Sequence, residues 1–345
     1  MRHFVIAAMA VALMGCPAPD GHVYSASSPD ASVKASTVLQ PVLDEFGFDG
    51  AIRISGGALD SVASDRGYAW PWASITKQVI ATLVMQEVET GRLDLDRPVS
   101  SYLAGWPQDG LPAPTLRQLL QHQSGLYDPE DDPAFQWEGA LPLDPMMCAA
   151  RRTKAPGGAF DYTNCDTLIV GLVLESRIGV SLADLFQSRI AAPAGMRHSR
   201  FVTVDTRLAA SRDGIPASLI AHYGAAGGLS GPLEDILRFD RALLSGKLLG
   251  YEAREEMWRG NPSLGYSALG QWETVLPLKN CEELVRVIER RGAIKGYQAR
   301  NFIIPQKGIS IAMAIARSED DYAFGEPWSG EGLSFGVLSA AVCAQ

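Results

Sequence analysis

The sequence predicts an α/β fold in which a body of strands and helices carries an inserted, mainly helical subdomain. Strand-like patterns occur near the beginning of the chain, at residues 51–69, and near its end, at residues 284–315. The long interval between them shows helical spacing of apolar residues instead. We therefore expect an N-terminal segment outside the fold, residues 1–38, followed by one domain, residues 39–345. The body of this domain comprises about 39–95 and 263–345, and its insertion covers about 96–262.

Composition narrows the classes of protein to consider. The chain has 345 residues, of which 47% are hydrophobic and 20% charged, an ordinary balance for a globular protein with a sizeable core. The 30 basic residues against 39 acidic ones give a net charge of −9. No basic run or basic–aromatic alternation is present to grip a phosphate backbone, so we expect no nucleic-acid partner.

The N-terminus has the features of an export signal. Arg2 precedes an apolar run at residues 4–14, which is too short to span a bilayer. The run ends at Gly15-Cys16, which resembles the lipobox of bacterial lipoproteins, so we expect residues 1–16 to be a signal peptide and Cys16 to be lipidated. The alternative is a plain secretory signal with Cys16 incidental. We thus expect a protein anchored by lipid in the bacterial cell envelope on the periplasmic side, or secreted to the periplasm.

The segment after the signal, residues 17–38, is rich in Pro, Ala, Ser and Asp and is expected to be a flexible tether from the membrane. Residues 51–54 then alternate like a strand, two glycines form a turn, and residues 59–69 are expected to return as a partner strand. Residues 74–89 space their apolar side chains as a helix does, and a glycine ends the pattern at position 91.

The remaining elements follow from the same periodicities. Helices are expected at about 115–121, 165–178, 181–190 and 232–244. Strands are expected at 284–288, 299–304 and 309–315, followed by an amphipathic helix near 331–343.

Four cysteines follow Cys16, an even number in an oxidising compartment. No C-x-x-C or His/Cys cluster indicates a metal site. Two disulfides are therefore expected, and three connectivities are open. We prefer Cys148–Cys165 and Cys281–Cys343, the pair nearest in sequence and the remaining two.

Two short motifs are candidates for chemistry. Ser74-Ile75-Thr76-Lys77 has the form S-x-x-K and places Ser74 and Lys77 one helical turn apart. Its structural alternative is a serine that caps the helix. Tyr162-Thr163-Asn164 precedes an apolar helix, and its alternative is a packed tyrosine with Asn164 as the cap.

Taken in order along the chain, five segments resemble the serine β-lactamase-related family, which includes class C β-lactamases, D-Ala-D-Ala carboxypeptidases, D-aminopeptidases and family VIII carboxylesterases. The segments are Ser74-Ile75-Thr76-Lys77, Leu119-Leu120-Gln121-His122-Gln123-Ser124-Gly125-Leu126, Tyr162-Thr163-Asn164, Pro193-Ala194-Gly195-Met196 and Gly227-Gly228-Leu229. The resemblance runs from about residue 48 to the C-terminus. It implies a β-lactamase/transpeptidase-like fold, with an antiparallel sheet flanked by helices.

The resemblance also implies a mechanism. Ser74 would attack a carbonyl and form an acyl-enzyme, with Lys77, Tyr162 or both accepting its proton. Asn164 would orient Lys77 and the substrate, and the backbone N–H groups of Ser74 and Ala293 would form the oxyanion hole. No metal or organic cofactor is required. His122 falls in a segment that is structural in this family.

The expected substrate is a small or peptidoglycan-like molecule, namely an ester, a D-amino-acid peptide or a β-lactam, and the protein is expected to act as a monomer. The alternative is a membrane-tethered binding protein that kept the fold and lost turnover. It would hold cell-wall peptides without cleaving them.

One part of the site departs from the family pattern. Relatives carry K-T-G or H-x-G on a strand beside the nucleophile, whereas this chain has Arg290-Arg291-Gly292. An arginine stays protonated and cannot shuttle a proton, so Arg290 and Gly292 are expected to bind substrate, with Arg290 holding a carboxylate. Because the wider arginine would also crowd the pocket, we expect weak β-lactamase turnover and better activity on esters or small peptides.

Overall fold

The computed structural model describes residues 29–57, 61–63, 69–132, 135, 144–152 and 154–343. The predicted signal peptide and Cys16 lie outside these residues. The predicted tether differs from the structure in its last part, because helix α1 begins at Pro29 and extends to Glu45. The cause is an apolar stripe that includes Leu39 and Leu43, which are 1% and 5% exposed. That stripe packs against the last helix of the chain.

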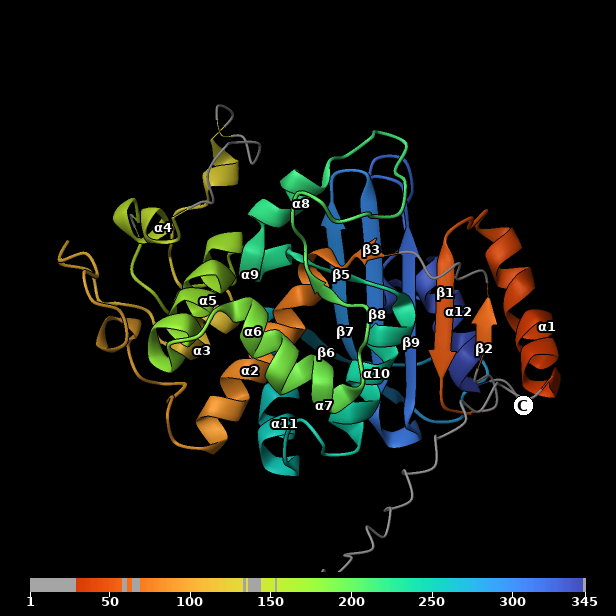
Figure 1. The fold of residues 1–345 in the computed structure, drawn as a ribbon. Coiled ribbons are helices and arrows are strands. Elements are labelled where there is room, and N and C mark those ends of the chain that lie inside the picture. Colours follow the sequence, from red (N-terminus) through yellow and green to blue (C-terminus); the bar gives the residue numbers. More distant parts are fainter. Residues whose placement is uncertain are drawn as a thin grey trace, which may run out of the picture.

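The central feature is an antiparallel sheet whose strand order is β2-β1-β9-β8-β7-β6 (Figure 1). The strands are β1 (Ala51–Ser55), β2 (Ser61–Ala63), β6 (Trp272–Leu276), β7 (Val285–Ile294), β8 (Tyr297–Ile304) and β9 (Ile309–Ile315). β1 pairs with β9, with Ile52 opposite Met313, so the two ends of the chain build one sheet. The antiparallel sheet that the resemblance implied is therefore present.

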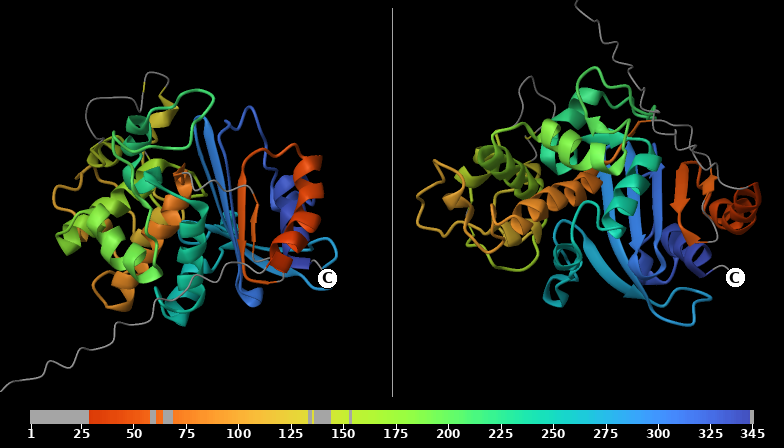
Figure 2. Two further views of the ribbon diagram at one scale, coloured as in Figure 1. Left: turned by 45° about the vertical axis from the view of Figure 1, so that its right-hand side comes forward. Right: turned by 60° about the horizontal axis from the view of Figure 1, so that its bottom comes forward.

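Helices cover both faces of this sheet. α1 and α12 (Gly332–Cys343) lie together on one face, and α10 (Leu233–Leu244) packs on the other (Figure 2). Side chains alternate accordingly along β9. Ile311 and Met313 belong to the cluster beneath α1 and α12, whereas Ala312 and Ala314 join the larger core on the opposite face. The small alanines let α10 approach the sheet closely.

The inserted part lies beside the second face of the sheet and is mainly helical (Figure 1). Its longest helix is α5 (Asn164–Ile178), and α2 (Thr76–Glu89), which belongs to the expected body and not to the expected insertion, packs against it. The shorter helices are α3 (Leu116–Leu120), α4 (Met146–Ala150), α6 (Leu182–Phe186), α7 (Ala192–Ala194), α8 (Ala217–His222), α9 (Gly224–Gly227) and α11 (Tyr251–Trp258). A small sheet of β3 (Trp70–Pro71), β5 (Leu229–Gly231) and β4 (Arg200–Phe201) joins them.

Tight helical turns complete the chain: η2 (Ala73–Ile75), η3 (Val99–Ser101), η4 (Pro129–Asp131), η6 (Pro262–Leu264), η7 (Pro305–Lys307), η8 (Pro327–Ser329) and the π-turn η5 (Gln187–Ala191). Several expected elements differ from the observed bounds. The expected strand 284–288 is only the first part of β7, the expected strand 299–304 begins earlier as β8, and β6 was not among the expected strands. The expected helix 181–190 consists of α6 followed by η5. The expected strand 59–69 is reduced to β2 where the structure describes it, while Trp70–Pro71 pairs with β5 in the small sheet.

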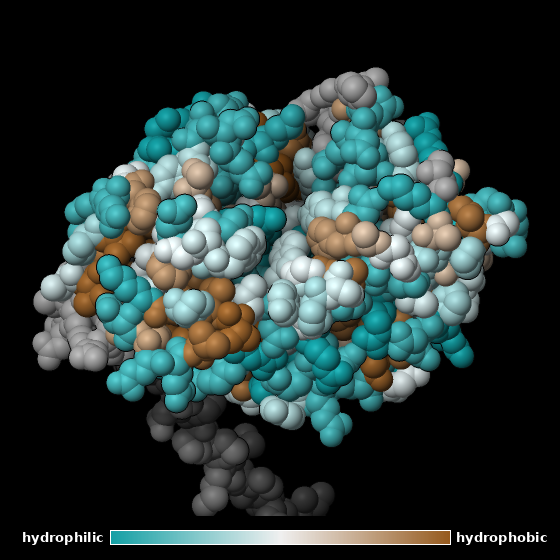
Figure 3. Space-filling view, turned by 180° about the vertical axis from the view of Figure 1, so that it is seen from behind, coloured by the Kyte–Doolittle hydropathy of each residue, from teal (hydrophilic) through white to brown (hydrophobic). Residues whose placement is uncertain are grey.

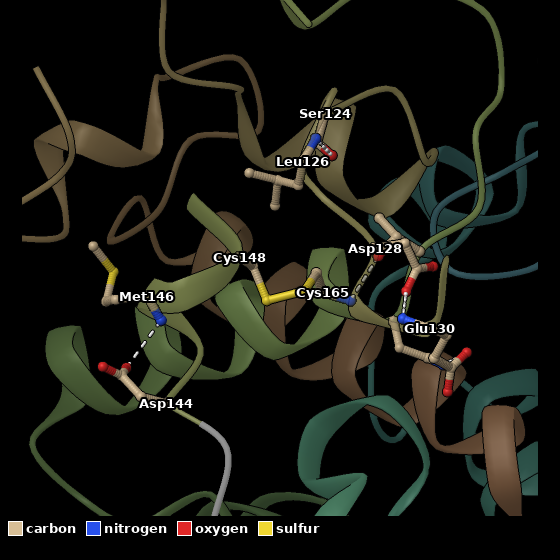
Figure 4. Close-up of a disulfide and its surroundings, with 10 residues drawn as sticks. Ser124, Leu126, Asp128, Glu130, Asp144, Met146, Cys148 and Cys165 are labelled. Carbon is tan, nitrogen blue, oxygen red and sulfur yellow. Dashed lines mark hydrogen bonds between the residues drawn. A yellow bond between two sulfur atoms is a disulfide. The ribbon is translucent and has the colours of Figure 1, made fainter. Parts of the chain in front are cut away.

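Both preferred disulfides are present in the structure. Cys148–Cys165 joins α4 to the first turn of α5 (Figure 4). Cys281–Cys343 ties the segment before β7 to the end of α12. The first bridge is therefore next to Asn164, whereas the second lies on the far side of the sheet.

The surface seen in Figure 3 is largely hydrophilic, with apolar side chains in separate patches. Among the described residues, no helix combines the length and the hydrophobicity that crossing a membrane requires.

Candidate active site

The S-x-x-K motif lies where the insertion meets the sheet. Ser74 is in the short turn η2, which runs directly into α2, and Lys77 is in the first turn of that helix. The residue before α2 is Ile75, and no side chain caps the helix there, so the reading of Ser74 as a capping serine is wrong. Ala73, just before Ser74, has φ of 47°, a left-handed conformation that is uncommon for a residue with a Cβ. Backbone strain of this kind is frequent at functional sites.

Lys77 is fully buried and makes three hydrogen bonds through its Nζ. Its partners are Ser74 Oγ at 3.0 Å, Asn164 Oδ1 at 2.8 Å and the Ala226 carbonyl at 2.6 Å. The Asn164 and Ala226 oxygens can only accept, so they take two N–H hydrogens. In the neutral amine the remaining lone pair then faces the Ser74 hydroxyl. This is the arrangement that a general base for Ser74 needs.

Tyr162 approaches the same hydroxyl from another side, with its Oη 2.8 Å from Ser74 Oγ. It lies just before α5, where Thr163 caps the helix by accepting from the Cys165 N–H. Asn164 is therefore not the cap, as the alternative reading had it, but the first residue of the helix, 6% exposed and directed at Lys77. The predicted residues Ser74, Lys77, Tyr162 and Asn164 form one hydrogen-bonded group.

Electrostatics make both basic groups of this cluster titrate below their ordinary range. Burial, aided by the charge of Arg290, lowers the pKa of Lys77 to about 8, although Tyr162 opposes the shift. Burial alone would raise the pKa of Tyr162, but the charges of Lys77 and Arg290 outweigh it and lower that pKa. Ser74 thus has two neighbours whose pKa values are lowered and which can accept its proton.

A second wall of the site is the end of β7. Strand β6 pairs with β7 only as far as Glu289, opposite Trp272, and the continuing edge Arg290–Ile294 lies against η2. A Cβ added at Gly292 would lie 2.5 Å from the Trp72 carbonyl oxygen and 2.8 Å from the Ser74 nitrogen. Only glycine therefore permits this approach. It brings the β7 edge that carries Ala293 beside the Ser74 amide.

Arg290 points into the same site but is 1% exposed. Its Nε donates to the Ser74 carbonyl at 2.9 Å and its Nη2 donates to Tyr162 Oη at 3.3 Å. Its guanidinium carbon lies 4.8 Å from the centre of the Trp272 ring. These partners belong to the protein, and they differ from the carboxylate contact that the sequence led us to expect.

His122 occupies the structural place that the resemblance implied. Its Nδ1 lies 2.9 Å from Asp166 Oδ2, both side chains are buried, and its ring packs 4.5 Å from that of Tyr162. Burial raises the pKa of Asp166 well above its usual value. Burial, with the charges of Arg290 and Lys77, lowers the pKa of His122 well below its own. The pair supports the Tyr162 ring and makes no hydrogen bond to Ser74.

Several contributors were not anticipated from the sequence. Ala226, whose carbonyl accepts from Lys77, directly precedes the Gly-Gly-Leu motif, and this motif could have indicated that the segment contributes to the site. In the sequence, Glu130 lies in a run of acidic residues that matches no motif. In the structure, its Oε2 accepts from Asn164 Nδ2 at 3.3 Å and its Oε1 accepts from Tyr223 Oη at 3.4 Å. Figure 4 shows Glu130 on the same side as the Cys165 end of the disulfide. In the described part of the chain, no group of three or more His, Cys, Asp or Glu side chains is arranged to hold a metal ion.

Comparison with known proteins agrees with this geometry. A D-aminopeptidase from Cereibacter sphaeroides is 30% identical over 290 residues, which cover 75% of this chain and 52% of the relative. The chain therefore spans about half the length of that relative.

Two solved structures share the fold. A D-stereospecific amidohydrolase from Streptomyces sp. superimposes with a TM-score of 0.70 at 24% identity, covering 91% of this chain and 99% of the other. The D-amino acid amidase from Ochrobactrum anthropi SV3, complexed with D-phenylalanine, gives 0.68 at 19% identity over 82% and 92% of the two chains. The profile of the Beta-lactamase family matches residues 59–329. Together with the ordered motifs and the geometry around Ser74, this match shows that the chain belongs to the Beta-lactamase family.

Proposed function

We propose that this protein is a serine hydrolase that cleaves amides or esters through an acyl-enzyme. The observation that carries the proposal is the group around Ser74 Oγ, with Lys77 Nζ at 3.0 Å and Tyr162 Oη at 2.8 Å. A hydroxyl held between two groups of lowered pKa is an activated nucleophile. The D-aminopeptidase and amidohydrolase names of its relatives support the same class of reaction.

The reaction proceeds in two steps, acylation of Ser74 and hydrolysis of the acyl-enzyme. Ser74 Oγ bonds to the substrate carbonyl carbon while its proton passes to Lys77 or Tyr162, and that proton then goes to the departing amine or alcohol as the scissile bond breaks. Water repeats the attack on the acyl-enzyme and restores the Ser74 hydroxyl. The N–H groups of Ser74 and Ala293 would hold the oxyanion, each contributing roughly 3–4 kcal/mol.

We propose further that the preferred substrate carries a free amino group next to the scissile carbonyl. Glu130 places an exposed carboxylate against Asn164, whose other amide atom contacts Lys77. A substrate carbonyl on Ser74 would set its α-ammonium group, two bonds away, toward this end of the site. An ammonium group there gains a charge-assisted hydrogen bond. The names of the relatives favour the D configuration for the acyl residue.

A panel of four chromogenic amides tests this substrate class. It consists of D-alanine p-nitroanilide, the L enantiomer, the N-acetylated D compound and the D compound with a carboxylate in place of the amine. We expect the free D-amine to be cleaved fastest. The substitution Glu130→Gln should lower kcat/KM for the free amine by about 10- to 100-fold, the value of one charged hydrogen bond, and leave kcat/KM for the N-acetyl compound almost unchanged.

Exposed Glu331, which lines a hollow between α1 and α12 on the opposite face of the sheet, gives the matched control Glu331→Gln, which should leave the cleavage of both amides unchanged. Faster cleavage of the N-acetyl or carboxylate compound by the unmodified protein would contradict the amine preference. Equal losses on both amides in Glu130→Gln would show that Glu130 acts only through Asn164.

For location and partners, we propose an exported protein held at the periplasmic side of the cell envelope by a lipid on Cys16, acting as a monomer on small or peptidoglycan-derived substrates. Two disulfides support an oxidising compartment. Mass spectrometry of the protein from a membrane fraction, compared with a Cys16→Ser variant, tests the anchor. A diacylglyceryl mass on Cys16 is expected, and an unmodified N-terminus in both proteins would contradict it.

A further inference from the structure

Arg290 stands at the position that relatives give to lysine or histidine, but its contacts are those of an internal brace. Its Nε and Nη2 bind two different acceptors at once, the Ser74 carbonyl and Tyr162 Oη. The rings of Trp272 and Tyr162 lie 4.8 Å and 5.6 Å from its guanidinium carbon. With 1% of the residue exposed, a substrate carboxylate cannot reach it unless this packing opens.

We propose that Arg290 is a positioning residue that fixes Tyr162 against the nucleophile and supplies a permanent positive charge to the tyrosine oxygen, instead of anchoring a substrate carboxylate. The proposal rests on the proposed hydrolase function and assigns it a specificity. The site offers an exposed carboxylate at Glu130, whereas its two cations, Lys77 and Arg290, are both buried. Such a site does not select for the carboxylate of a β-lactam or of a D-Ala-terminated peptide.

The two-point contact is specific to arginine. A guanidinium carries its donors on separate nitrogens of a rigid planar fork, so Nε and Nη2 reach acceptors that lie apart. A lysine side chain has a single nitrogen, so it can donate to both the Ser74 carbonyl and Tyr162 Oη only if that nitrogen lies within hydrogen-bond distance of both oxygens. Lysine nevertheless preserves the charge, which separates the two parts of the role by mutation.

The surrounding charges leave Arg290 and Lys77 as the cations that act on Tyr162. Several charged and titratable groups surround Arg290 and Tyr162. From the helical side these are Lys77 on α2, His122 after α3, Glu130 on η4 and Asp166 on α5. From the sheet side they are Glu289 and Arg291 on β7, with Arg300 on β8 and Glu326 before η8. Glu289 is paired with Arg300, and Arg291 with Glu326. Burial lowers the pKa of Arg290, opposed by Tyr162, but a guanidinium remains charged at neutral pH.

The charge of Arg290 also affects the pH dependence of the reaction. A fixed positive charge favours the deprotonated forms of both Tyr162 and Lys77, and so lowers both pKa values. Removing the charge should raise them and move the rise of the rate to more alkaline pH. A residue that only filled space would leave the pH dependence in place.

The test compares Arg290→Gln and Arg290→Lys on two matched esters, p-nitrophenyl butyrate and mono-p-nitrophenyl glutarate, which differ by a terminal carboxylate. We expect Arg290→Gln to lower kcat/KM by about 10- to 100-fold on both esters alike, the value of one charged hydrogen bond. Its pH midpoint should move to higher pH. Arg290→Lys should keep the pH midpoint of the unmodified protein and recover part of the rate.

A second measurement does not depend on activity. The ultraviolet absorbance of tyrosinate, recorded against pH and corrected by a Tyr162→Phe variant, reports the ionisation of Tyr162 itself. The midpoint should rise in Arg290→Gln and stay in Arg290→Lys. If Arg290→Gln does not fold, Arg290→Met, which also removes the charge and keeps an apolar stem at this buried position, takes its place.

The outcomes separate this proposal from the proposed function. A loss confined to the glutarate ester would show a carboxylate anchor and overturn the proposal, as would an unchanged tyrosinate midpoint in Arg290→Gln. If the unmodified protein cleaves no substrate and Ser74 takes no label, the proposed function fails. The absorbance titration then still decides whether Arg290 controls Tyr162.

Discussion

The site has two walls that are built differently. One wall consists of η2, α2 and the start of α5, and its side chains reach Ser74 Oγ directly through Lys77 and Tyr162. The other wall is the edge of β7, which contributes a backbone approach at Gly292 and the buried guanidinium of Arg290. The first wall supplies the groups that move protons. The second wall fixes where those groups and the nucleophile stand.

The difference explains how this chain can carry an arginine at position 290 and keep the groups that transfer protons. Proton transfer needs a group that can gain and lose a proton at the working pH, so the roles of Lys77 and Tyr162 require residues that titrate. The second wall requires a close backbone and a positive charge. Arginine can meet that requirement as well as lysine, although it cannot shuttle a proton.

The largest effect should come from the first wall. Ser74→Ala removes the atom that forms the acyl-enzyme, so covalent labelling by a fluorophosphonate and hydrolysis of an activated ester should both disappear. Intact mass spectrometry measures the label, and the melting temperature should stay within a few degrees. Ser101→Ala, at an exposed serine of η3, is the control and should label normally. A labelled Ser74→Ala protein would remove the assignment.

Tyr162→Phe should have the next largest effect. It deletes the oxygen that contacts Ser74 Oγ at 2.8 Å while keeping the ring that packs against His122. If Tyr162 takes part in proton transfer, kcat should fall by about 10²- to 10⁴-fold with little change in KM. Stopped-flow acylation by p-nitrophenyl butyrate measures this step. A loss smaller than about 10-fold would leave Lys77 as the working base on its own.

The pH profile should distinguish the two bases. Lys77 has a pKa lowered to about 8, so at lower pH it is increasingly protonated and cannot accept the serine proton. With Lys77 as base, kcat/KM for a neutral ester should rise about 10-fold per pH unit below this value and level off above it. A fall above pH 8 would instead show that charged Lys77 assists a tyrosinate at Tyr162. We expect the level profile, because the Asn164 and Ala226 oxygens orient the neutral amine toward Ser74.

A smaller effect is expected from the second wall. A Cβ at Gly292 would meet backbone atoms of Trp72 and Ser74, so Gly292→Ala should push β7 away from η2. We expect kcat/KM to fall by about 10- to 100-fold as the oxyanion donors separate, with less change in KM. Gly158→Ala is the matched control, since nothing lies within 4 Å of a Cβ there. Equal activity of the two variants would show that β7 does not need this close approach.

The two walls were also unequally predictable from sequence. Ser74 and Lys77 lie one helical turn apart, so their proximity follows from helix geometry alone. The expected strand 309–315 and the middle of the expected helices also matched the structure, because their apolar periodicity is strong. The partners of Arg290 could not be derived in this way. They depend on where β6 stops pairing and on which side of β7 meets η2, both of which are set by tertiary packing.

Other misses have the same physical origin. Residues 29–38, the first part of α1, were expected to belong to a tether because the segment is rich in Pro, Ala, Ser and Asp. The helix is explained by its contact with α12, which buries Leu39 and Leu43. Glu130 sits in the short turn η4, where no periodic pattern marks it, and its significance comes from Asn164 across the site. Local spacing thus predicted that Ser74 and Lys77 lie together, the family resemblance added Tyr162 and Asn164, and long-range contacts determined the residues around them.

The smallest effect on activity should come from the disulfide beside the first wall. The chain-entropy model assigns about 3 kcal/mol of stability to Cys148–Cys165, which spans 17 residues, and about 4 kcal/mol to Cys281–Cys343, which spans 62. Replacing each pair by alanine should therefore lower the free energy of unfolding more for the second bridge, as measured by denaturant unfolding.

Activity should show the opposite order. Cys165 follows Asn164 in the first turn of α5, so losing that bridge should lower kcat/KM about two- to fivefold through a looser Lys77–Asn164 contact. The bridge behind the sheet should leave kcat/KM unchanged, and a larger loss from the distant pair would show that the site's geometry depends on the whole sheet and not on the local wall.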